Sequence, residues 1–121
     1  MNIMAETVGC MTGLTREGGV LAAQFTFLES YRGFQGHFPT QKVLPGVCQI
    51  LCALAVIEQA EGGRARLTEV ILAKYAAPVL PGETLSCTVQ CPGEAAQGVY
   101  KARLEAGGKK ISELKLRVEK G

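Results

Sequence analysis

The clearest feature of the hydrophobic pattern is one long stretch, residues 43–61, in which apolar side chains fill nearly every position before the last turn. A Pro-Gly pair stands near its start and a Gly-Gly pair follows its end, and both are typical of helix boundaries. The stretch therefore predicts a helix over 43–61, with Pro45 in the first turn and Gly62 at the end. Because its apolar positions surround the axis, we expect this helix to be buried on most sides.

The other apolar positions mostly alternate with polar ones, which is the period of a half-buried strand. Glycine and proline pairs separate these segments and predict turns, including a hairpin turn at Gly107-Gly108. The pattern predicts strands at 20–27, 66–75, 83–91, 99–106 and 111–119, after a short strand-like piece within 1–10. Residues 28–42 form a long connection before the helix, and a connection of that length in a small domain is commonly functional.

This order of elements indicates an α+β architecture, in which a curved antiparallel β-sheet wraps one central buried helix. The chain has 121 residues, so we expect one domain spanning 1–121. A single sheet covers only part of the circumference of so apolar a helix. A second subunit is therefore expected to cover the rest.

Composition narrows the class of partner. Hydrophobic residues make up 47% of the chain and charged residues 20%, as in ordinary soluble proteins. The net charge is +2 and no basic stripe with interleaved aromatics occurs, which argues against nucleic acid and against an anionic membrane. No apolar run approaches the roughly 20 residues of a membrane span, and the N-terminus lacks a signal-peptide pattern. We expect a cytoplasmic protein.

The five cysteines allow two interpretations. Cys48 and Cys52 share a helix face, and Cys87 and Cys91 share a strand face, so a metal site is one alternative. Zinc sites usually use close Cys-x-x-Cys pairs or added histidines, and neither occurs here. We favour small buried side chains in a reducing compartment and expect no metal.

The single histidine is the main candidate for chemistry near neutral pH. His37 lies in the long connection, shortly before the Pro-Gly pair that opens the predicted helix. A helix start carries free backbone N–H groups that stabilise negative charge. His37 is therefore a candidate general base beside an anion-stabilising group.

Two segments resemble the active-site region of the hotdog-fold (3R)-hydroxyacyl-[acyl carrier protein] dehydratases. The more specific one is Gly36-His37-Phe38-Pro39, then Val43-Leu44-Pro45-Gly46-Val47, then Gln49. The weaker one is Ala73-Lys74-Tyr75-Ala76-Ala77-Pro78-Val79-Leu80-Pro81-Gly82-Glu83. The resemblance spans roughly Phe34 to Val89. It implies a hotdog fold, a dimer, and a tunnel for the acyl chain at the subunit interface.

The resemblance also implies roles for the matching residues. His37 would remove the proton next to the thioester carbonyl, while backbone N–H groups of Gly46 and Val47 would polarise that carbonyl. Base and oxyanion donors must act together, because the α-proton is weakly acidic until the enolate is stabilised. The residues implied to line the tunnel or support the site are Phe38, Gln49 and Leu51. The acyl group would be carried on the phosphopantetheine of acyl carrier protein or on coenzyme A, with no other cofactor.

One position departs from the family's pattern. In the family, an acidic residue on the central helix of the other subunit protonates the departing β-hydroxyl, and it lies fourteen positions after the histidine. Here that position is Leu51. The first carboxylate downstream, Glu58, returns to nearly the same helix face but about 10 Å further along the axis. Glu29, in the long connection, has no spacing that argues for it.

Three functions follow from this pattern. The first is a dehydratase-like lyase that eliminates water from 3-hydroxyacyl thioesters in fatty acid, polyketide or aryl polyene synthesis, with a substitute acid. The second is a non-catalytic or half-site subunit of a heterodimer, in which a related dehydratase supplies the acid opposite His37. The third is an acyl thioesterase or acyl-binding hotdog protein. The dehydratase ranks first, because the histidine and the helix start are both kept.

Overall fold

The computed structural model describes residues 2–35, 42–93 and 98–121. His37 and Phe38 therefore lie outside the described residues. The helical elements are α1 (Ile3–Gly9), the 3-10 turn η1 (Arg32–Phe34) and α2 (Gly46–Glu61). The strands are β1 (Met11–Glu17), β2 (Val20–Thr26), β3 (Ala65–Tyr75), β4 (Thr84–Gln90), β5 (Val99–Ala106) and β6 (Lys109–Lys120).

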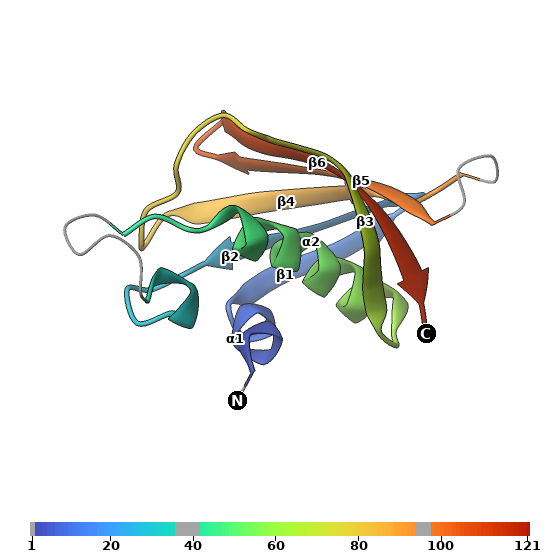
Figure 1. The fold of residues 1–121 in the computed structure, drawn as a ribbon, viewed down its shortest axis with the longest axis horizontal. Helices are drawn as coiled ribbons and strands as arrows, with labels where there is room; N and C mark the ends of the chain where they lie inside the picture. The colour runs from blue at the N-terminus through green and yellow to red at the C-terminus, as the bar shows by residue number, and fades with distance from the viewer. Residues whose placement is uncertain (1, 36–41, 94–97) are drawn as a thin grey trace.

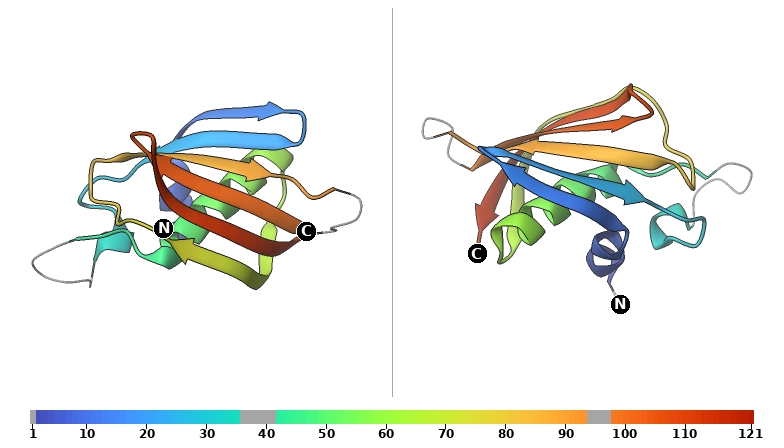
Figure 2. Two further views of the ribbon diagram at one scale, coloured as in Figure 1. Left: turned by 90° about the horizontal axis from the view of Figure 1, so that it is seen from above. Right: turned by 180° about the vertical axis from the view of Figure 1, so that it is seen from behind.

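The described strands form one six-stranded sheet in the order β1-β2-β4-β5-β6-β3. Every neighbouring pair is antiparallel. The sheet curves, and α2 crosses its inner face (Figures 1 and 2). This arrangement confirms the predicted α+β hotdog architecture. It leaves β1 and β3 as the two edge strands, so β3 has one side without a partner strand.

The core lies between α2 and the inner face of the sheet. Along β4, buried Leu85, Cys87 and Val89 alternate with more exposed residues, as their period of two predicts. In α2, nine consecutive or nearly consecutive residues are buried: Cys48, Gln49, Ile50, Cys52, Ala53, Leu54, Ala55, Val56 and Ile57. The prediction that this helix is buried on most sides is therefore confirmed.

Two predicted elements need correction. The strand-like piece within 1–10 is wrong, because Ile3–Gly9 is a helix whose first turn is capped by the Asn2 side chain, 2.8 Å from the Ala5 nitrogen. The central helix begins at Gly46 rather than at 43. Pro45 is its N-cap, with extended backbone angles, and not a residue of its first turn. Gly62 ends the helix as expected, at φ 79°.

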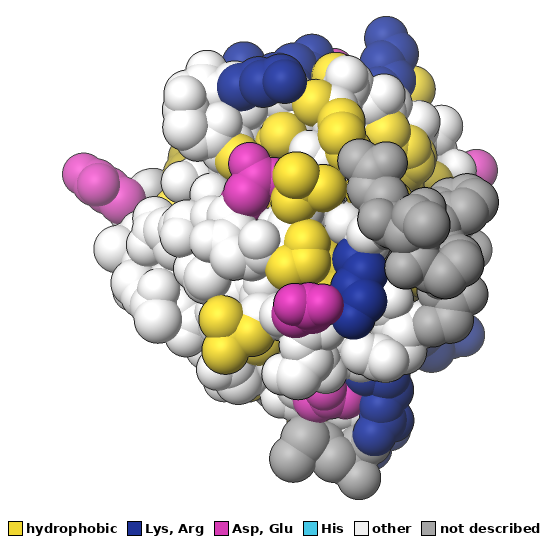
Figure 3. All heavy atoms as spheres, turned by 90° about the vertical axis from the view of Figure 1, so that its left-hand side faces the viewer, with side chains coloured by type: hydrophobic (Ala, Val, Ile, Leu, Met, Phe, Trp, Pro, Cys, Tyr) yellow, Lys and Arg dark blue, Asp and Glu magenta, His cyan; other side chains and the backbone are white. Residues whose placement is uncertain are grey.

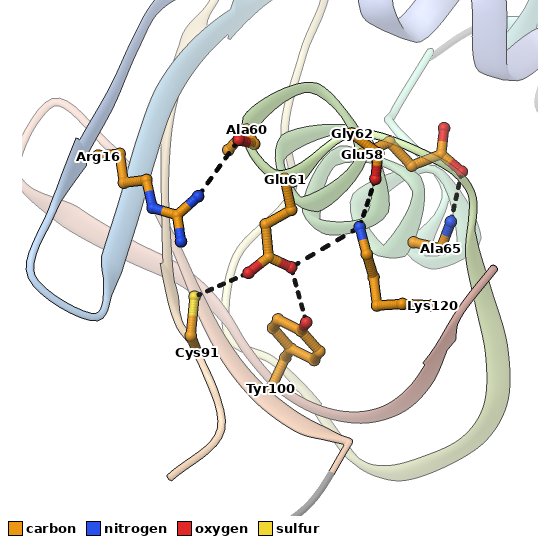
Figure 4. A network of polar contacts seen from close by, with 9 residues as sticks. All are labelled: Arg16, Glu58, Ala60, Glu61, Gly62, Ala65, Cys91, Tyr100 and Lys120. Atoms are coloured by element: carbon orange, nitrogen blue, oxygen red, sulfur yellow. Dashed lines mark hydrogen bonds and ion pairs between the residues drawn. The ribbon is translucent and has the colours of Figure 1, made fainter.

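The far end of α2 is fixed to the sheet by a polar network (Figure 4). The Tyr100 hydroxyl donates to Glu61 Oε1 at 2.8 Å, and Lys120 Nζ lies 3.8 Å from the same carboxylate. Lys120 also donates to the Gly62 carbonyl oxygen at 2.6 Å, and Arg16 donates to that of Ala60 at 3.4 Å. Cations thus meet the negative end of the helix, which holds α2 in place along its axis.

No helix in the described part of the chain is long and apolar enough to cross a membrane.

Candidate active site

Two connections meet at the end of the molecule where α2 begins, the one that precedes α2 and the one between β3 and β4. The Leu44 N–H donates to the Val79 carbonyl oxygen at 2.8 Å, and the Gly82 N–H donates to that of Phe27, also at 2.8 Å. Figure 3 views this end, where apolar side chains form a broken band on the surface. The described part of the first family motif, around Leu44, is therefore brought to the second motif, around Val79.

The start of α2 has no side-chain cap. The Cys48 and Gln49 N–H groups both donate to the Pro45 carbonyl oxygen, at 3.0 and 3.3 Å. Within the described residues, the N–H groups of Gly46 and Val47 make no backbone hydrogen bond. Val47 is 64% exposed. The two residues predicted to polarise a carbonyl thus present backbone donors at an open helix start.

A pocket of about 330 Å³ opens beside this helix start. Its lining residues are Val43, Leu44, Gly46, Gln49, Tyr75, Ala76, Ala77 and Pro78. No aspartate or glutamate of the described residues is among them. The polar side chains of the lining are Gln49 and Tyr75, so the described wall is neutral.

Tyr75, at the end of β3, lies directly against the helix start. A Cβ added to Gly46 would lie 2.6 Å from the Tyr75 Cζ and 2.7 Å from its hydroxyl oxygen, so glycine is the residue that lets the ring approach. Burial raises the pKa of the Tyr75 hydroxyl, which keeps the phenol neutral near pH 7. The sequence predicts Tyr75 only as the last residue of the strand 66–75, and the fold brings it to Gly46.

Gln49 is unusual among the residues of the pocket. Its side chain is 2% exposed, and its Oε1 atom has no hydrogen-bond partner among the described residues. A buried polar group without a partner costs free energy. The structure thus places Gln49 at the predicted site, in the wall of the pocket.

Leu51 lies elsewhere on the helix. It is partly buried and packs against the core, one turn after exposed Val47 and on the same helix face. Gln49 and Leu51 are two residues apart, so they point in nearly opposite directions. The structure therefore brings Gly46 and Gln49 together in the wall of the pocket. It directs the side chains of Val47 and Leu51 away from that pocket.

The carboxylates considered as substitute acids are engaged in other contacts. Glu58 Oε2 accepts the Ala65 N–H at 2.8 Å and so stabilises the turn into β3. Glu29 is largely exposed and forms an ion pair with Lys42 at 3.3 Å, across the connection that contains His37. Neither lines the pocket beside Gly46.

The thiols are also poor acids. Burial raises the pKa of the Cys48 and Cys52 thiols, and raises that of Cys87 to about 12. All five cysteines are free. In residues 2–35, 42–93 and 98–121, no group of three or more histidine, cysteine, aspartate or glutamate residues is placed to hold a metal ion.

The chain is similar to known proteins in both sequence and structure. Residues 14–115 match the family described as ApeI-like, ApeI dehydratase. The chain is 35% identical over 91 residues to the 3-hydroxyacyl-[acyl-carrier-protein] dehydratase FabZ of Enterococcus faecalis. It is 31% identical, again over 91 residues, to that of Clostridium novyi. Each match covers 69% of this chain but 64% of the length of the relative.

Solved structures share the fold at low sequence identity. The dehydratase heterocomplex ApeI:P from Xenorhabdus doucetiae matches with a TM-score of 0.78 and 20% identity, covering 89% of this chain and 95% of that chain. The E. coli PaaI protein, from the phenylacetic acid degradation operon, matches with a TM-score of 0.69 and 18% identity, covering 97% and 87%. These matches show that the fold is shared.

Proposed function

This chain belongs to the ApeI-like dehydratase family, and from that premise we propose that it acts as a lyase that eliminates water from 3-hydroxyacyl thioesters. The observation that carries the proposal is the open start of α2, where the Gly46 and Val47 N–H groups make no backbone hydrogen bond among the described residues and Gly46 lines a neutral pocket. His37 stands nine residues before Gly46 in the sequence motif, and we propose it as the base that the reaction needs beside the oxyanion site.

In the proposed reaction, the His37 imidazole accepts the proton from C2 of the acyl chain. The released electron pair moves toward the thioester oxygen, where the Gly46 and Val47 N–H groups stabilise the negative charge. The pair then forms the C2–C3 double bond as the C3–O bond breaks. The hydroxyl leaves as water once it receives a proton, and the products are a 2,3-unsaturated thioester and water.

The proton for the departing hydroxyl is the part of the reaction that this chain supports least. Leu51 holds the family's acid position, and no carboxylate of the described residues lines the pocket. This observation favours a second candidate function, in which the chain is a half-site subunit and a related dehydratase supplies the acid. The ApeI:P complex, described as a dehydratase heterocomplex, is a precedent in the family's fold.

We propose that the edge of β3 is where a second subunit binds, whether that is a copy of this chain or a related dehydratase. The strand carries exposed apolar side chains in its central part: Val70 at 43%, Ile71 at 37% and Leu72 at 37%. An apolar edge strand of this kind favours pairing with another chain. Pairing there would continue the sheet and lay a second subunit beside the start of α2.

The sequence relatives are dehydratases of 3-hydroxyacyl groups on acyl carrier protein. They support a 3-hydroxyacyl group on acyl carrier protein as the substrate, with coenzyme A as the alternative carrier. The chain would need no cofactor beyond that carrier, because proton transfer and oxyanion stabilisation suffice for the elimination. A substrate of that class and five free cysteines fit a reducing cytoplasm.

The test replaces the proposed base. His37→Ala should abolish formation of the unsaturated thioester, which is followed by its ultraviolet absorbance, while Gln59→Ala, on the exposed last turn of α2, should leave the rate unchanged. Release of free thiol, measured in the same samples, distinguishes a thioesterase from a dehydratase. Unchanged elimination in His37→Ala would refute the catalytic proposal.

The half-site alternative has its own measurement. The chain is mixed with an acid-bearing dehydratase of the family, and the mass in solution and the elimination rate are both measured. A heterodimer that is active where this chain alone is inactive would establish the half-site function. A chain that eliminates water alone, and ignores the added dehydratase, would refute it.

A further inference from the structure

We propose that the Gln49 amide and the Tyr75 hydroxyl bind the 3-hydroxyl group of the acyl thioester, and so distinguish 3-hydroxyacyl from saturated acyl chains. The inference rests on the proposed function for the class of ligand. Its starting point is a residue that the fold by itself does not explain. Gln49 is 2% exposed, and its Oε1 has no partner among the described residues.

An apolar side chain of similar size would suit the interior of this chain better than an amide without a partner. Replacing such a buried polar group by an apolar one is commonly neutral or stabilising. Its neighbours in the helix sequence are apolar, with Cys48 and Ile50 both buried. Because the described residues offer the Gln49 Oε1 no partner, we place its partner in the pocket that the side chain lines.

The wall of the pocket indicates which chemical group that partner carries. Its polar side chains are Gln49 and Tyr75. Both are neutral near pH 7, because an amide does not titrate and the pKa of a phenol is ordinarily about 10, which burial raises further at Tyr75. An amide and a phenol each combine a donor with an acceptor. A hydroxyl group also donates and accepts, so it satisfies the Gln49 side chain whichever way the amide is turned.

The position of Gln49 along α2 indicates which hydroxyl. Gln49 lies three residues beyond Gly46, which is about 4.5 Å along the helix axis. The 3-carbon of an acyl chain is two bonds from the thioester carbon, about 2.5 Å away, and its hydroxyl oxygen extends one bond further. With the thioester carbonyl at the Gly46 and Val47 N–H groups, the 3-hydroxyl comes to the level of Gln49.

Tyr75 closes the same space from the side of the sheet. Its hydroxyl oxygen lies 2.7 Å from the place where a Gly46 Cβ would be, so the phenol tip adjoins the helix start. In this arrangement Gln49 and Tyr75 are positioning residues that hold the leaving group. Neither residue is proposed as the donor of the proton that the hydroxyl needs on departure. In the half-site alternative, that proton comes from the acid of a related dehydratase.

The experiment measures ligand discrimination. Binding of 3-hydroxyoctanoyl-pantetheine and of octanoyl-pantetheine is measured in a His37→Ala background, so that the hydroxylated probe is not consumed. We expect Gln49→Met to lower the preference for the hydroxylated probe by about 2- to 12-fold, the worth of one neutral hydrogen bond. Affinity for the saturated probe should stay the same. Tyr75→Phe should act in the same direction.

Matched controls separate a binding role from a structural one. Gln59→Met makes the same change on the exposed last turn of α2, and Tyr100→Phe removes a hydroxyl that bonds Glu61 at the far end of the helix. Neither should alter discrimination. Gln49→Met should also raise the melting temperature by about 3–6 °C, because it removes a buried amide without a partner.

Three outcomes in Gln49→Met would overturn the inference. The first two are equal loss of affinity for both probes and no change in preference. The third is a lower melting temperature, since it would assign the amide a structural partner. The proposed reaction can fail separately. If the preference for the hydroxylated probe depends on Gln49 but the wild-type chain eliminates no water, the binding inference holds and the proposed reaction is refuted.

Discussion

Two glycines at the site end of the molecule provide a matched test of how much room each one has. Gly46→Ala and Gly33→Ala each add one methyl group, and neither glycine has a positive φ angle, so any cost comes from contacts. At Gly46 the added Cβ meets the phenol tip of Tyr75, at 2.6 and 2.7 Å. Tyr75 is 47% exposed, so its ring can turn outward.

At Gly33 the same methyl group meets buried atoms. The added Cβ would overlap the Tyr31 ring and lie 2.8 Å from the Cys48 Sγ. Tyr31 is 4% exposed, its hydroxyl lies 2.8 Å from the Thr7 Oγ1, and its ring packs 4.4 Å from that of Phe27. The ring can give way only by disturbing this packing.

The magnitudes follow from these surroundings. Overpacking a buried site costs about 1–3 kcal/mol, and loss of the bond between Tyr31 and Thr7 would add about 1 kcal/mol. Gly→Ala recovers about 0.4–1 kcal/mol through the unfolded chain. We therefore expect Gly33→Ala to lower the free energy of unfolding by about 1–3 kcal/mol and Gly46→Ala to change it by less than about 1 kcal/mol.

Urea unfolding gives both free energies, and the elimination assay gives the functional effect. Gly46→Ala should fold normally but turn over 3-hydroxyacyl thioesters more slowly, because the methyl group and the displaced ring crowd the helix start. Equal destabilisation by the two substitutions would refute the claim that the ring beside Gly46 can move aside and the ring beside Gly33 cannot. Full activity in Gly46→Ala would refute the role of the space in front of α2.

Three further predictions concern the acid, the interface and pH. Because Leu51 points away from the pocket of its own chain, the carboxyl group of Leu51→Glu can act only in the site of a second subunit. In a dimer the substitution should create or raise elimination activity, because an apolar site raises the pKa of a carboxyl group and keeps it protonated. A folded variant without any gain would assign the acid to another residue or to a partner. Val70→Lys on β3 should lower the mass in solution, whereas Leu14→Lys on the opposite edge strand should not. Burial raises the pKa of the Cys87 thiol from 9.0 to about 12. Because the folded state favours the protonated thiol, the contribution of Cys87 to the free energy of unfolding is complete below pH 9. It is lost as the pH rises toward 12, and the loss is about 1.4 kcal/mol at pH 10. Urea unfolding at pH 7 and at pH 10 measures this loss, and Cys87→Val should remove it. If the free energy of unfolding falls equally between the two pH values in the wild type and in Cys87→Val, the loss does not come from Cys87.

The sequence by itself determined the elements whose signals are local. The apolar run with its Pro-Gly and Gly-Gly boundaries predicts α2, and the Gly107-Gly108 pair, at φ 57° and 79°, forms the predicted hairpin turn. The motif around His37 and Gly46 predicts the family and the place of the site. The helix Ile3–Gly9 was missed, because a helix this short depends on its Asn2 cap and on packing against α2.

Only the tertiary structure decided which side chains meet at the site. Strand pairing places β3 at an edge and brings Tyr75 against Gly46, two residues that share no local pattern. Burial separates Gln49 from Leu51, although both follow the same motif on one helix. Both results depend on which face of α2 the curved sheet covers. Helical and strand periods fix which residues share a face, whereas the long-range packing of the faces fixes what each one contacts.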